Sequence, residues 1–335
     1  MDTITTPPTR VNGNGNGQAH GQVNGNGHEP AHYPLLRGKI QQLKRERNAV
    51  ILAHNYQEGA IQDIADFLGD SLNLARWARE TQAEVIVFCG VHFMAETAAM
   101  LNPTKLVLIP DLEAGCSLAD MIVPHQIRQW RAKHPCGLVV CYINTSAAVK
   151  AECDYCCTSS NAIKVVESLP ADKEILFVPD YYLGSYVKAK TKRKIHVWKG
   201  YCPAHAVIDP ERIDRLRDQY EDAEFLMHPE CGCLTKQMDL ADQILSTEGM
   251  VKYVKQSPAK RFIIATENGI LHRMRKDNPD KEFFPASEHA SCHHMQRNTL
   301  DKVFWSLATL QHRVSVDPKL ARRALVPIER MMALK

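Results

Sequence analysis

Short apolar runs of strand length alternate with segments of helical period from residue 49 onward. The eight clearest runs, each bounded by polar or turn-forming residues, are 50–53, 85–88, 106–109, 138–142, 175–178, 195–198, 225–227 and 262–265. Continuous apolar runs of this length are typical of parallel strands that are buried on both faces. Their alternation with helical segments indicates βαβ units. The pattern therefore predicts an α/β fold built on parallel sheets.

Three of the predicted strands end in polar side chains that can bind or react with a ligand. These side chains are His54 and Tyr56, then Tyr142 and Asn144, and finally His228 and Glu230. A hydroxyl residue follows each strand end by 17 to 19 residues and precedes an amphipathic segment, and these residues are Ser71, Ser159 and Thr247. In that position we expect the hydroxyl groups to act as helix N-caps.

Three cysteines extend this internal repeat. Cys202 lies 86 residues after Cys116, Cys292 lies 90 residues after Cys202, and each follows its strand end by 60 to 64 residues. Such a register across three copies predicts a triplicated fold. We expect three pseudo-threefold-related α/β/α sandwich domains at residues 34–122, 123–209 and 210–299, with residues 300–335 packing on the first. The Asn/Gly-rich segment 1–33 has little to bury and is expected to be disordered.

A shared site should lie where the three domains meet. Ligands of open parallel sheets gather at the carboxyl ends of the strands, so three such sheets would direct their strand ends into one central cavity. Helix N-termini beside the hydroxyl residues would offer N–H groups to an anion. Three thiolates fit either a zinc ion with an open fourth position or a 4Fe–4S cluster with one open iron.

The charge and the apolar content of the chain argue against some classes of function. The 335 residues carry a formal net charge of +3, and the basic runs are short, which argues against a nucleic-acid partner. No apolar run reaches the roughly 20 residues of a membrane span, and the N-terminus lacks the apolar core of a secretion signal. We therefore expect a cytoplasmic protein without a membrane partner.

Eleven cysteines in a reducing compartment are not expected to form a disulfide framework. Eight of them are interpreted mainly as small buried hydrophobic residues. Cys153, Cys156 and Cys157 lie at a strand-to-helix junction, Cys231 and Cys233 flank a glycine, and Cys89, Cys136 and Cys141 lie in or beside strands. This leaves Cys116, Cys202 and Cys292 as the candidate metal ligands.

Several motifs resemble the quinolinate synthase family, in the same order along the chain. They include Ala-His-Asn-Tyr-Gln at 53–57, Gly-Asp-Ser at 69–71, Ala-Gly-Cys-Ser-Leu-Ala-Asp at 114–120, Tyr-Ile-Asn-Thr-Ser-Ala-Ala-Val-Lys at 142–150, Thr-Ser-Ser-Asn at 158–161, Phe-Val-Pro-Asp at 177–180, His-Pro-Glu-Cys at 228–231 and Thr-Glu-Asn-Gly-Ile at 266–270. The resemblance covers most of residues 35–310. It implies three pseudo-symmetric α/β/α domains and a 4Fe–4S transferase of NAD biosynthesis. That family condenses iminoaspartate (iminosuccinate) with dihydroxyacetone phosphate, giving quinolinate, phosphate and water.

The resemblance also implies roles for individual residues. The cluster ligands are Cys116, Cys202 and Cys292. The substrate-binding residues are His54, Ser71, Tyr142, Asn144, Ser159, His228, Glu230 and Thr247, with Ser246 as the alternative to Thr247. Tyr56 and Glu230 are candidates for proton transfer, and His205 for an acid/base or ligand-supporting role. The iminoaspartate would come from L-aspartate oxidase or dehydrogenase.

Two other functions compete with this assignment. A zinc hydrolase or lyase would use the same three cysteines around a zinc ion with an open position. A non-catalytic iron–sulfur sensor would use the cluster as a redox switch. Polar side chains converging on the cysteines argue against the sensor, as does the lack of an evident DNA-binding or partner module. Some relatives have a Cys-x-x-Cys-x-x-Cys run at the third ligand, whereas Cys292 is followed here by two histidines.

Overall fold

Three four-stranded parallel sheets form the framework of this computed structural model, which describes residues 30–334. The expected disorder of the N-terminal segment falls on residues 1–29, outside the described part. The first sheet contains β1 (Ala49–His54), β2 (Phe67–Gly69), β3 (Val85–Cys89) and β4 (Leu106–Leu108). The second contains β5 (Leu138–Tyr142), β6 (Tyr155–Cys157), β7 (Ile175–Val178) and β8 (Ile195–Val197). The third contains β9 (Glu224–Met227), β10 (Gln243–Ile244), β11 (Arg261–Ala265) and β12 (Glu282–Pro285).

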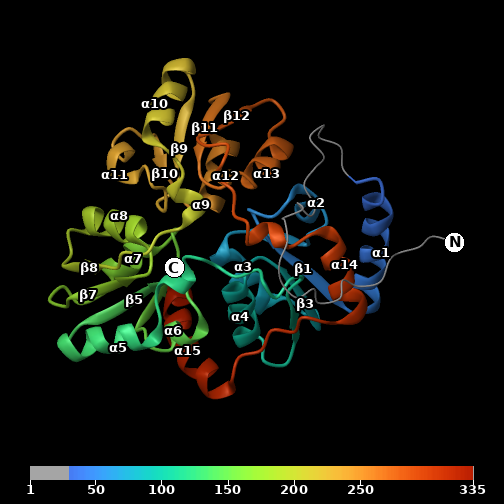
Figure 1. The fold of residues 1–335 in the computed structure, drawn as a ribbon, viewed down its shortest axis with the longest axis horizontal. Helices are drawn as coiled ribbons and strands as arrows, with labels where there is room; N and C mark the ends of the chain where they lie inside the picture. The colour runs from blue at the N-terminus through green and yellow to red at the C-terminus, as the bar shows by residue number, and fades with distance from the viewer. Residues whose placement is uncertain (1–29, 335) are drawn as a thin grey trace, which may run out of the picture.

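The three sheets share one topology. In each, the first strand in the chain lies between the second and the third, so the spatial orders are β2-β1-β3-β4, β6-β5-β7-β8 and β10-β9-β11-β12. Figure 1 shows the three units arranged around a common centre. The predicted α/β architecture with three parallel-sheet units is confirmed.

All eight predicted strands are present, and four further strands were missed. The missed strands are β2, β6, β10 and β12, which all lie at sheet edges. The first three have only two or three residues, too few to show a periodicity. Strand β12 begins with an exposed glutamate and ends in proline, a residue that edge strands tolerate.

Helices cover both faces of the sheets. They are α1 (Tyr33–Glu46), α2 (Gly59–Gln62), α3 (Ser71–Glu80), α4 (His92–Leu101), α5 (Pro124–Lys133), α6 (Ala147–Lys150), α7 (Ala162–Glu167), α8 (Tyr181–Thr191), α9 (Pro203–Ala206), α10 (Pro210–Gln219), α11 (Leu234–Gln237), α12 (Thr247–Gln256), α13 (Ile270–Asp277), α14 (Leu300–Thr309) and α15 (Pro318–Ala333). In β1, Ile51 and Ala53 pack with α1 and α14, whereas Leu52 faces the cluster that includes residues of α3 and α4. Burial on both faces explains why the strands read as continuous apolar runs. Among the described residues, no helix is long and apolar enough to cross a membrane.

One aspartate precedes the second strand of every unit. Asp66, Asp154 and Asp242 are each separated by 88 residues, and each side chain accepts a hydrogen bond of 2.7 Å from a backbone N–H near the start of the first strand. Each aspartate N–H also donates to the carbonyl of that same strand residue, at 2.9 to 3.0 Å. The reciprocal pair closes the β-α-β connection and sets where the edge strand begins.

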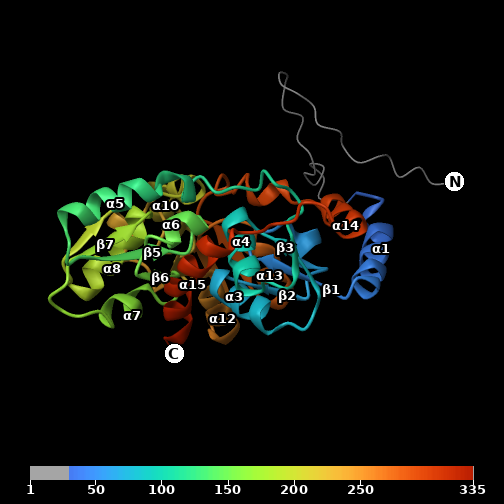
Figure 2. The same ribbon diagram turned by 90° about the horizontal axis from the view of Figure 1, so that it is seen from below.

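The C-terminal segment divides between two units. Helix α14 packs against α1 and β3 of the first unit. Helix α15 instead lies against α6 and β6 of the second unit, with a smaller contact to α4. Figure 2 shows α15 between the first two units. The expectation that residues 300–335 pack on the first unit is therefore wrong for α15. Its apolar stripe, which includes Ala324, Ile328 and Met331, is buried.

Candidate functional site

A central cavity lies at the carboxyl ends of the strands, and residues from all three units line it. Every candidate site residue borders this cavity: His54, Tyr56, Ser71, Cys116, Tyr142, Asn144, Ser159, Cys202, His205, His228, Glu230, Thr247 and Cys292. Sequence reasoning did not assign the other polar lining residues, which are Asp70, Thr158 and Glu267. Among residues 30–334, no lysine or arginine lines the cavity. Negative charge on a ligand would therefore be balanced by neutral hydrogen-bond donors or by a metal.

The three cysteines occupy equivalent positions. Each follows the last strand of its sheet and precedes one short helical turn, which is Ala119–Met121 after Cys116, α9 after Cys202 and Met295–Arg297 after Cys292. A thiol before a helical turn meets the free N–H groups of that turn. All three side chains are partly buried against the central core.

Burial raises the pKa of Cys116 to about 12 and that of Cys292 to about 11. Burial also raises the pKa of Cys202 well above its usual value, and the negative charge of Glu230 adds to the effect. Backbone N–H groups of the following turn oppose the shift at each cysteine. Three thiols that influence one another across one cavity, with N–H donors directed at their sulfurs, fit a soft metal centre that would hold them as thiolates.

Glu230 is the central acidic group. Tyr142 Oη donates a hydrogen bond to Glu230 Oε1, while His228 Nδ1 lies 3.8 Å from Oε1 and His205 Nδ1 lies 3.7 Å from Oε2. Burial raises the pKa of Glu230 to about 7, although the Tyr142 hydrogen bond opposes the rise. A carboxyl group with a pKa near neutrality can both accept and release a proton under ordinary conditions.

Tyr56, His205 and Thr266 form a hydrogen-bonded triangle beside Glu230. Tyr56 Oη lies 2.6 Å from Thr266 Oγ1 and 3.2 Å from His205 Nε2, and Thr266 Oγ1 lies 3.0 Å from the same His205 nitrogen. Burial, followed by the charge of Glu230, raises the pKa of Tyr56 well above its usual value. Tyr56 is therefore a neutral hydroxyl that can donate a proton. Thr266 opens the Thr-Glu-Asn-Gly-Ile motif, but it was not assigned to the site.

The cavity histidines are neutral at ordinary pH. Burial lowers the pKa of His54 to about 3, with a further contribution from His205, and lowers the pKa of His205 to about 4. The pKa of His228 is also well below its usual value because of burial. The His205 and His228 rings stack at 5.1 Å, and His228 Nε2 lies 3.2 Å from Ser159 Oγ. These neutral imidazoles can therefore each donate one hydrogen bond and accept another.

The observed helix N-caps lie one or two residues away from the hydroxyl residues that were predicted to be caps. Asp70 caps α3 through Asn73 N–H at 2.9 Å, and Ser246 caps α12 through Gly249 N–H at 3.2 Å. Ser71 and Thr247 are the first helical residues, and their side chains border the cavity. Ser159 lies two residues before Asn161, the N-cap of α7. The N-cap prediction is therefore wrong for all three residues. At Ser71 and Thr247 the preceding side chain occupies the cap, whereas Ser159 lies before the cap residue.

Comparison with known proteins identifies the family. The family model described as Quinolinate synthetase A protein matches residues 38–333. The chain is 54% identical over 303 residues to a quinolinate synthase of Pyrobaculum aerophilum, covering 89% of this chain and 99% of that protein. It is 54% identical over 301 residues to one of Thermus thermophilus, and 48% identical over 297 residues to one of Methanosarcina barkeri, covering 89% of this chain and 97% of each.

This chain belongs to the quinolinate synthase family. It is therefore an enzyme, and the family suggests a metal cofactor. Ligand atoms of Cys202, His205 and Glu230 all lie within 4.8 Å of one another in the cavity. The cysteine arrangement described above adds two more thiols from the other units.

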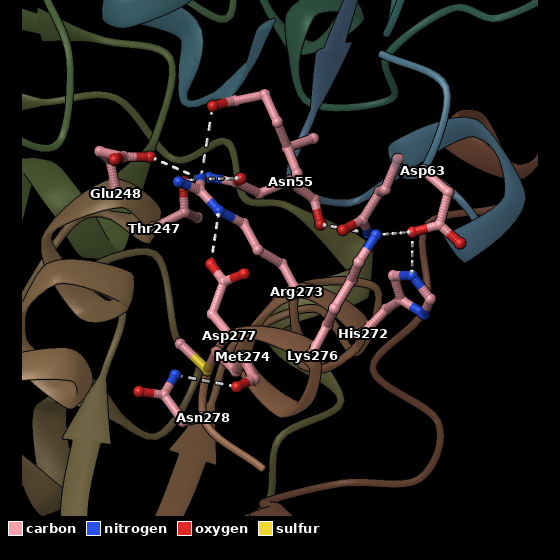
Figure 3. A network of polar contacts seen from close by, with 12 residues as sticks. Asn55, Asp63, Thr247, Glu248, His272, Arg273, Met274, Lys276, Asp277 and Asn278 are labelled. Atoms are coloured by element: carbon pink, nitrogen blue, oxygen red, sulfur yellow. Dashed lines mark hydrogen bonds and ion pairs between the residues drawn. The ribbon is translucent and has the colours of Figure 1, made fainter. Parts of the chain in front are cut away.

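A network of polar contacts reaches Thr247, one of the residues that line the cavity (Figure 3). Arg273 of α13 donates from Nη1 to Asn55 Oδ1 and to Glu248 Oε2, both at 2.8 Å. Asn55 in turn donates from Nδ2 to Thr247 Oγ1 at 3.1 Å. Asn55 belongs to the first unit, whereas Arg273 and Thr247 belong to the third. The network therefore fixes Thr247 across a boundary between units, and the His-Asn-Tyr motif was the only signal that pointed to Asn55.

Glu267 holds the loop of the third cysteine. Its carboxylate accepts hydrogen bonds from Cys292 N–H at 3.1 Å and from Gly269 N–H at 2.7 Å. Burial raises the pKa of Glu267 to about 7, and these two N–H groups oppose the rise. Glycine is required at 269, because a Cβ there would lie 2.7 Å from the carbonyl oxygen of Tyr56. Glu267 belongs to the Thr-Glu-Asn-Gly-Ile motif at 266–270, although it was not assigned to the site.

The remaining cysteines mostly follow the prediction. Cys89, Cys141, Cys153, Cys156 and Cys157 are free and buried. Cys136 was expected in the core but is exposed, because it lies in the turn before β5. Cys231 and Cys233 are buried, as expected, and a disulfide joins them.

Proposed function

We propose that this enzyme condenses iminoaspartate with dihydroxyacetone phosphate to give quinolinate, phosphate and two molecules of water. The carbon skeletons of the two substrates join through one new carbon–carbon bond and one new carbon–nitrogen bond. The bond from carbon to the phosphate oxygen breaks, and the two oxygen atoms lost from the carbon skeletons leave as water. No external oxidant is needed, because the losses of phosphate and water complete the aromatic ring.

The observation that carries the proposal is the convergence of three thiols and the strand-end polar residues on one cavity. Cys116, Cys202 and Cys292 come from three different units and border the same space. They would hold a 4Fe–4S cluster with three cysteine ligands. Such a cluster supplies a Lewis acid at its open iron, which suits the removal of hydroxyl groups.

The cavity has groups suited to anionic substrates. Ser71 and Thr247 lie in the first turns of two ten-residue helices, where free N–H groups and the helix dipole favour a carboxylate or phosphate. His54, Asn144, Ser159 and His228 would add hydrogen bonds from the remaining sides, and Tyr142 would orient Glu230. Because no lysine or arginine of the described part of the chain lines the cavity, these neutral groups would orient the substrates.

Proton transfer falls to two neighbouring groups. Glu230 would remove and return protons at carbon and nitrogen atoms of the joined skeleton, since its pKa of about 7 suits both directions. Tyr56, hydrogen-bonded to Thr266 and His205, would deliver a proton to a departing hydroxyl group. His205 Nδ1 lies 3.7 Å from Glu230 Oε2, so the two groups can pass protons to one another after a small shift.

The test is to purify the full chain without air, measure iron, sulfide and zinc, and assay quinolinate. We expect brown protein with about four irons per chain, as for one 4Fe–4S cluster. Adding dihydroxyacetone phosphate and freshly generated iminoaspartate should yield quinolinate and phosphate in equal amounts. Colourless protein with stoichiometric zinc would overturn the proposal in favour of a zinc hydrolase or lyase. Iron-loaded protein that forms no quinolinate would favour the sensor.

The proposal places the enzyme in NAD biosynthesis in the cytoplasm. Its unstable substrate iminoaspartate would come from an enzyme that oxidises aspartate, either an oxidase or a dehydrogenase. Coupled assays with each type of enzyme would test this supply. Equal quinolinate yields from enzymatic and chemical sources of iminoaspartate would show that no dedicated partner is needed.

A further inference from the structure

A second cluster of potential metal ligands lies far from the cavity, at the amino ends of two strands in the second unit. His134 is the C-cap residue of α5, Glu174 immediately precedes β7, and His196 lies within β8. Figure 1 places these three elements in the outer part of the molecule. Cavity residues follow the carboxyl ends of β5, β6 and β8 in the same sheet, so the two sites lie at opposite ends of its strands.

The three ligand atoms converge on one point. His134 Nδ1 lies 2.8 Å from Glu174 Oε2, His196 Nε2 lies 3.4 Å from the same oxygen, and all three atoms lie within 4.8 Å of one another. Ligands bound at about 2.0–2.2 Å to a tetrahedral zinc ion are separated by roughly 3.3–3.5 Å. Shifts of an ångström or less would therefore bring the three atoms to coordination distance.

His196 supplies an independent observation. Its Nε2 atom is buried and has no hydrogen-bond partner among the described residues, although it faces Glu174 Oε2. A buried polar atom of this kind normally has a partner, so one that lacks it calls for an explanation. A metal ion bound between His134, Glu174 and His196 would give it one.

The surroundings hold the ligands in place. Trp130 stacks on the His134 ring at 4.5 Å and meets the His196 ring edge-on at 5.8 Å. The backbone of Glu174 accepts a hydrogen bond from Leu138 N–H. Ligands fixed on strands and a helix end lose little freedom on binding a metal.

Lys194 is the one cation paired with this carboxylate in the described structure. Lys194 contacts Glu174 Oε1, so the other carboxylate oxygen, Oε2, faces the histidines. Lys194 and His134 lower the pKa of Glu174 to about 2, so the carboxylate is charged at neutral pH. The Lys194 side chain is 70% exposed and can turn into solvent when a divalent cation arrives.

We propose that His134, Glu174 and His196 form a second metal site that binds a divalent transition-metal ion, with Zn²⁺ as its best match. Two imidazoles and one carboxylate are ligands that zinc accepts, and water would take the fourth position. The ion would tie the end of α5 to the starts of β7 and β8. It would stabilise the second unit and take no part in the reaction at the central cavity.

The test titrates cluster-loaded, full-length protein with Zn²⁺ under anaerobic conditions and measures zinc and iron per chain after gel filtration. The variants are His196→Asn and Glu174→Gln, and the control is His125→Asn, an exposed histidine near the other end of α5. Wild type and control should retain one zinc at micromolar free zinc, with iron unchanged. Each ligand variant should bind zinc more weakly than wild type by more than about 100-fold, the upper end of the loss typical of removing a group that only supports a ligand.

Two further measurements keep the test decisive. Co²⁺, which is paramagnetic, should quench the fluorescence of Trp130, and the quench should disappear in Trp130→Phe. Zinc should raise the melting temperature of wild type and leave that of His196→Asn unchanged. Equal zinc binding by wild type and both ligand variants would overturn the proposal, as would no binding by wild type or zinc uptake that displaces iron. Quinolinate formation does not enter the test, so its outcome is separate from that of the proposed function.

Discussion

The two ends of the three sheets contrast sharply. At the amino ends of the edge strands, all three units use the same device, an aspartate that accepts a backbone N–H at 2.7 Å. At the carboxyl ends, the equivalent positions after the first strand carry different groups, which are His54 and Tyr56, Tyr142 and Asn144, or His228 and Glu230. The repeat is therefore uniform at the strand starts. At the cavity it keeps the three cysteines and the three hydroxyl residues but varies the residues at the end of the first strand.

The difference follows from what each end must satisfy. A strand start presents a backbone N–H whose position is the same in every unit, so one side chain suits all three. The cavity encloses a single shared space, and three copies of one residue could not supply a carboxyl group, a phenol and neutral imidazoles together. The surroundings of the carboxyl groups also differ. In the cavity, burial raises the pKa of Glu230 to about 7. At the strand starts, Asp66 and Asp154 form ion pairs with Lys44 and Arg131.

The largest predicted effect is the loss of iron and activity when a cavity cysteine is replaced. Cys202→Ala should reduce iron per chain to background and abolish quinolinate formation, because the cluster would lose one of three ligands. Cys136→Ala, which changes an exposed cysteine, should keep both. Iron and sulfide analysis of protein purified without air measures the effect. A Cys202→Ala protein with full iron content would contradict the ligand assignment.

Glu230→Gln should retain the cluster and lose turnover by about 100- to 10,000-fold, the usual contribution of a general acid or base. Glutamine preserves the shape of the side chain but cannot take up a proton. The matched control is Glu288→Gln at an exposed position of the third unit. The assay compares kcat at equal iron content. Unchanged kcat in Glu230→Gln would remove Glu230 from the proton-transfer steps.

At the amino ends, the predicted effect is on stability. Asp154→Ala should lower the free energy of unfolding by about 1–3 kcal/mol, because Val139 N–H and Arg131 lose their acceptor. Asp154→Asn keeps an acceptor oxygen and should lose less. Denaturant unfolding measures the change, and quinolinate formation per folded chain should stay near wild type. Equal losses in the two variants would show that the charge, rather than the hydrogen bond to the strand, stabilises the unit.

The smallest predicted effect concerns Arg273, which holds Thr247 in place through Asn55. Arg273→Lys keeps the charge but cannot reach both Asn55 and Glu248, so Thr247 should be less firmly placed. Loss of one hydrogen bond, worth about 1 kcal/mol, should weaken quinolinate binding by about fivefold. Arg275→Lys on the same helix, at an exposed position, is the control. Isothermal titration measures the affinity, and equal affinities in the two variants would show that Arg273 does not position Thr247.

Much of the fold could be predicted from local patterns. The eight predicted strands, which include all six central ones, are apolar runs long enough to be recognised, and the cysteine spacing indicated three units. Edge strands such as β10, with two residues, carry too little sequence to show a period. The packing of α15 on the second unit was also beyond prediction, because an amphipathic helix does not specify which apolar face it will cover.

The candidate site was likewise predicted where local patterns indicate a residue and missed where its position depends on distant contacts. Repeat and resemblance pointed to residues that all border the cavity, yet they missed Thr266, Glu267 and Arg273, whose positions depend on contacts between distant segments. They also placed helix caps one residue late at Ser71 and Thr247, because several neighbouring polar residues can serve as a cap.

Strand positions, the threefold repeat and the identity of the three thiols were already determined by the order of residues. They rest on periodicity and spacing, which are properties of neighbouring or regularly repeated residues. Burial and three-dimensional contact decided the raised pKa of Glu230, the support of Thr247 by Asn55, and the meeting of His134, Glu174 and His196. Those histidines and that glutamate are separated by 40 and 22 residues and form no sequence motif. A pKa or a ligand cluster depends on which groups surround an atom, and that is defined once the chain has folded.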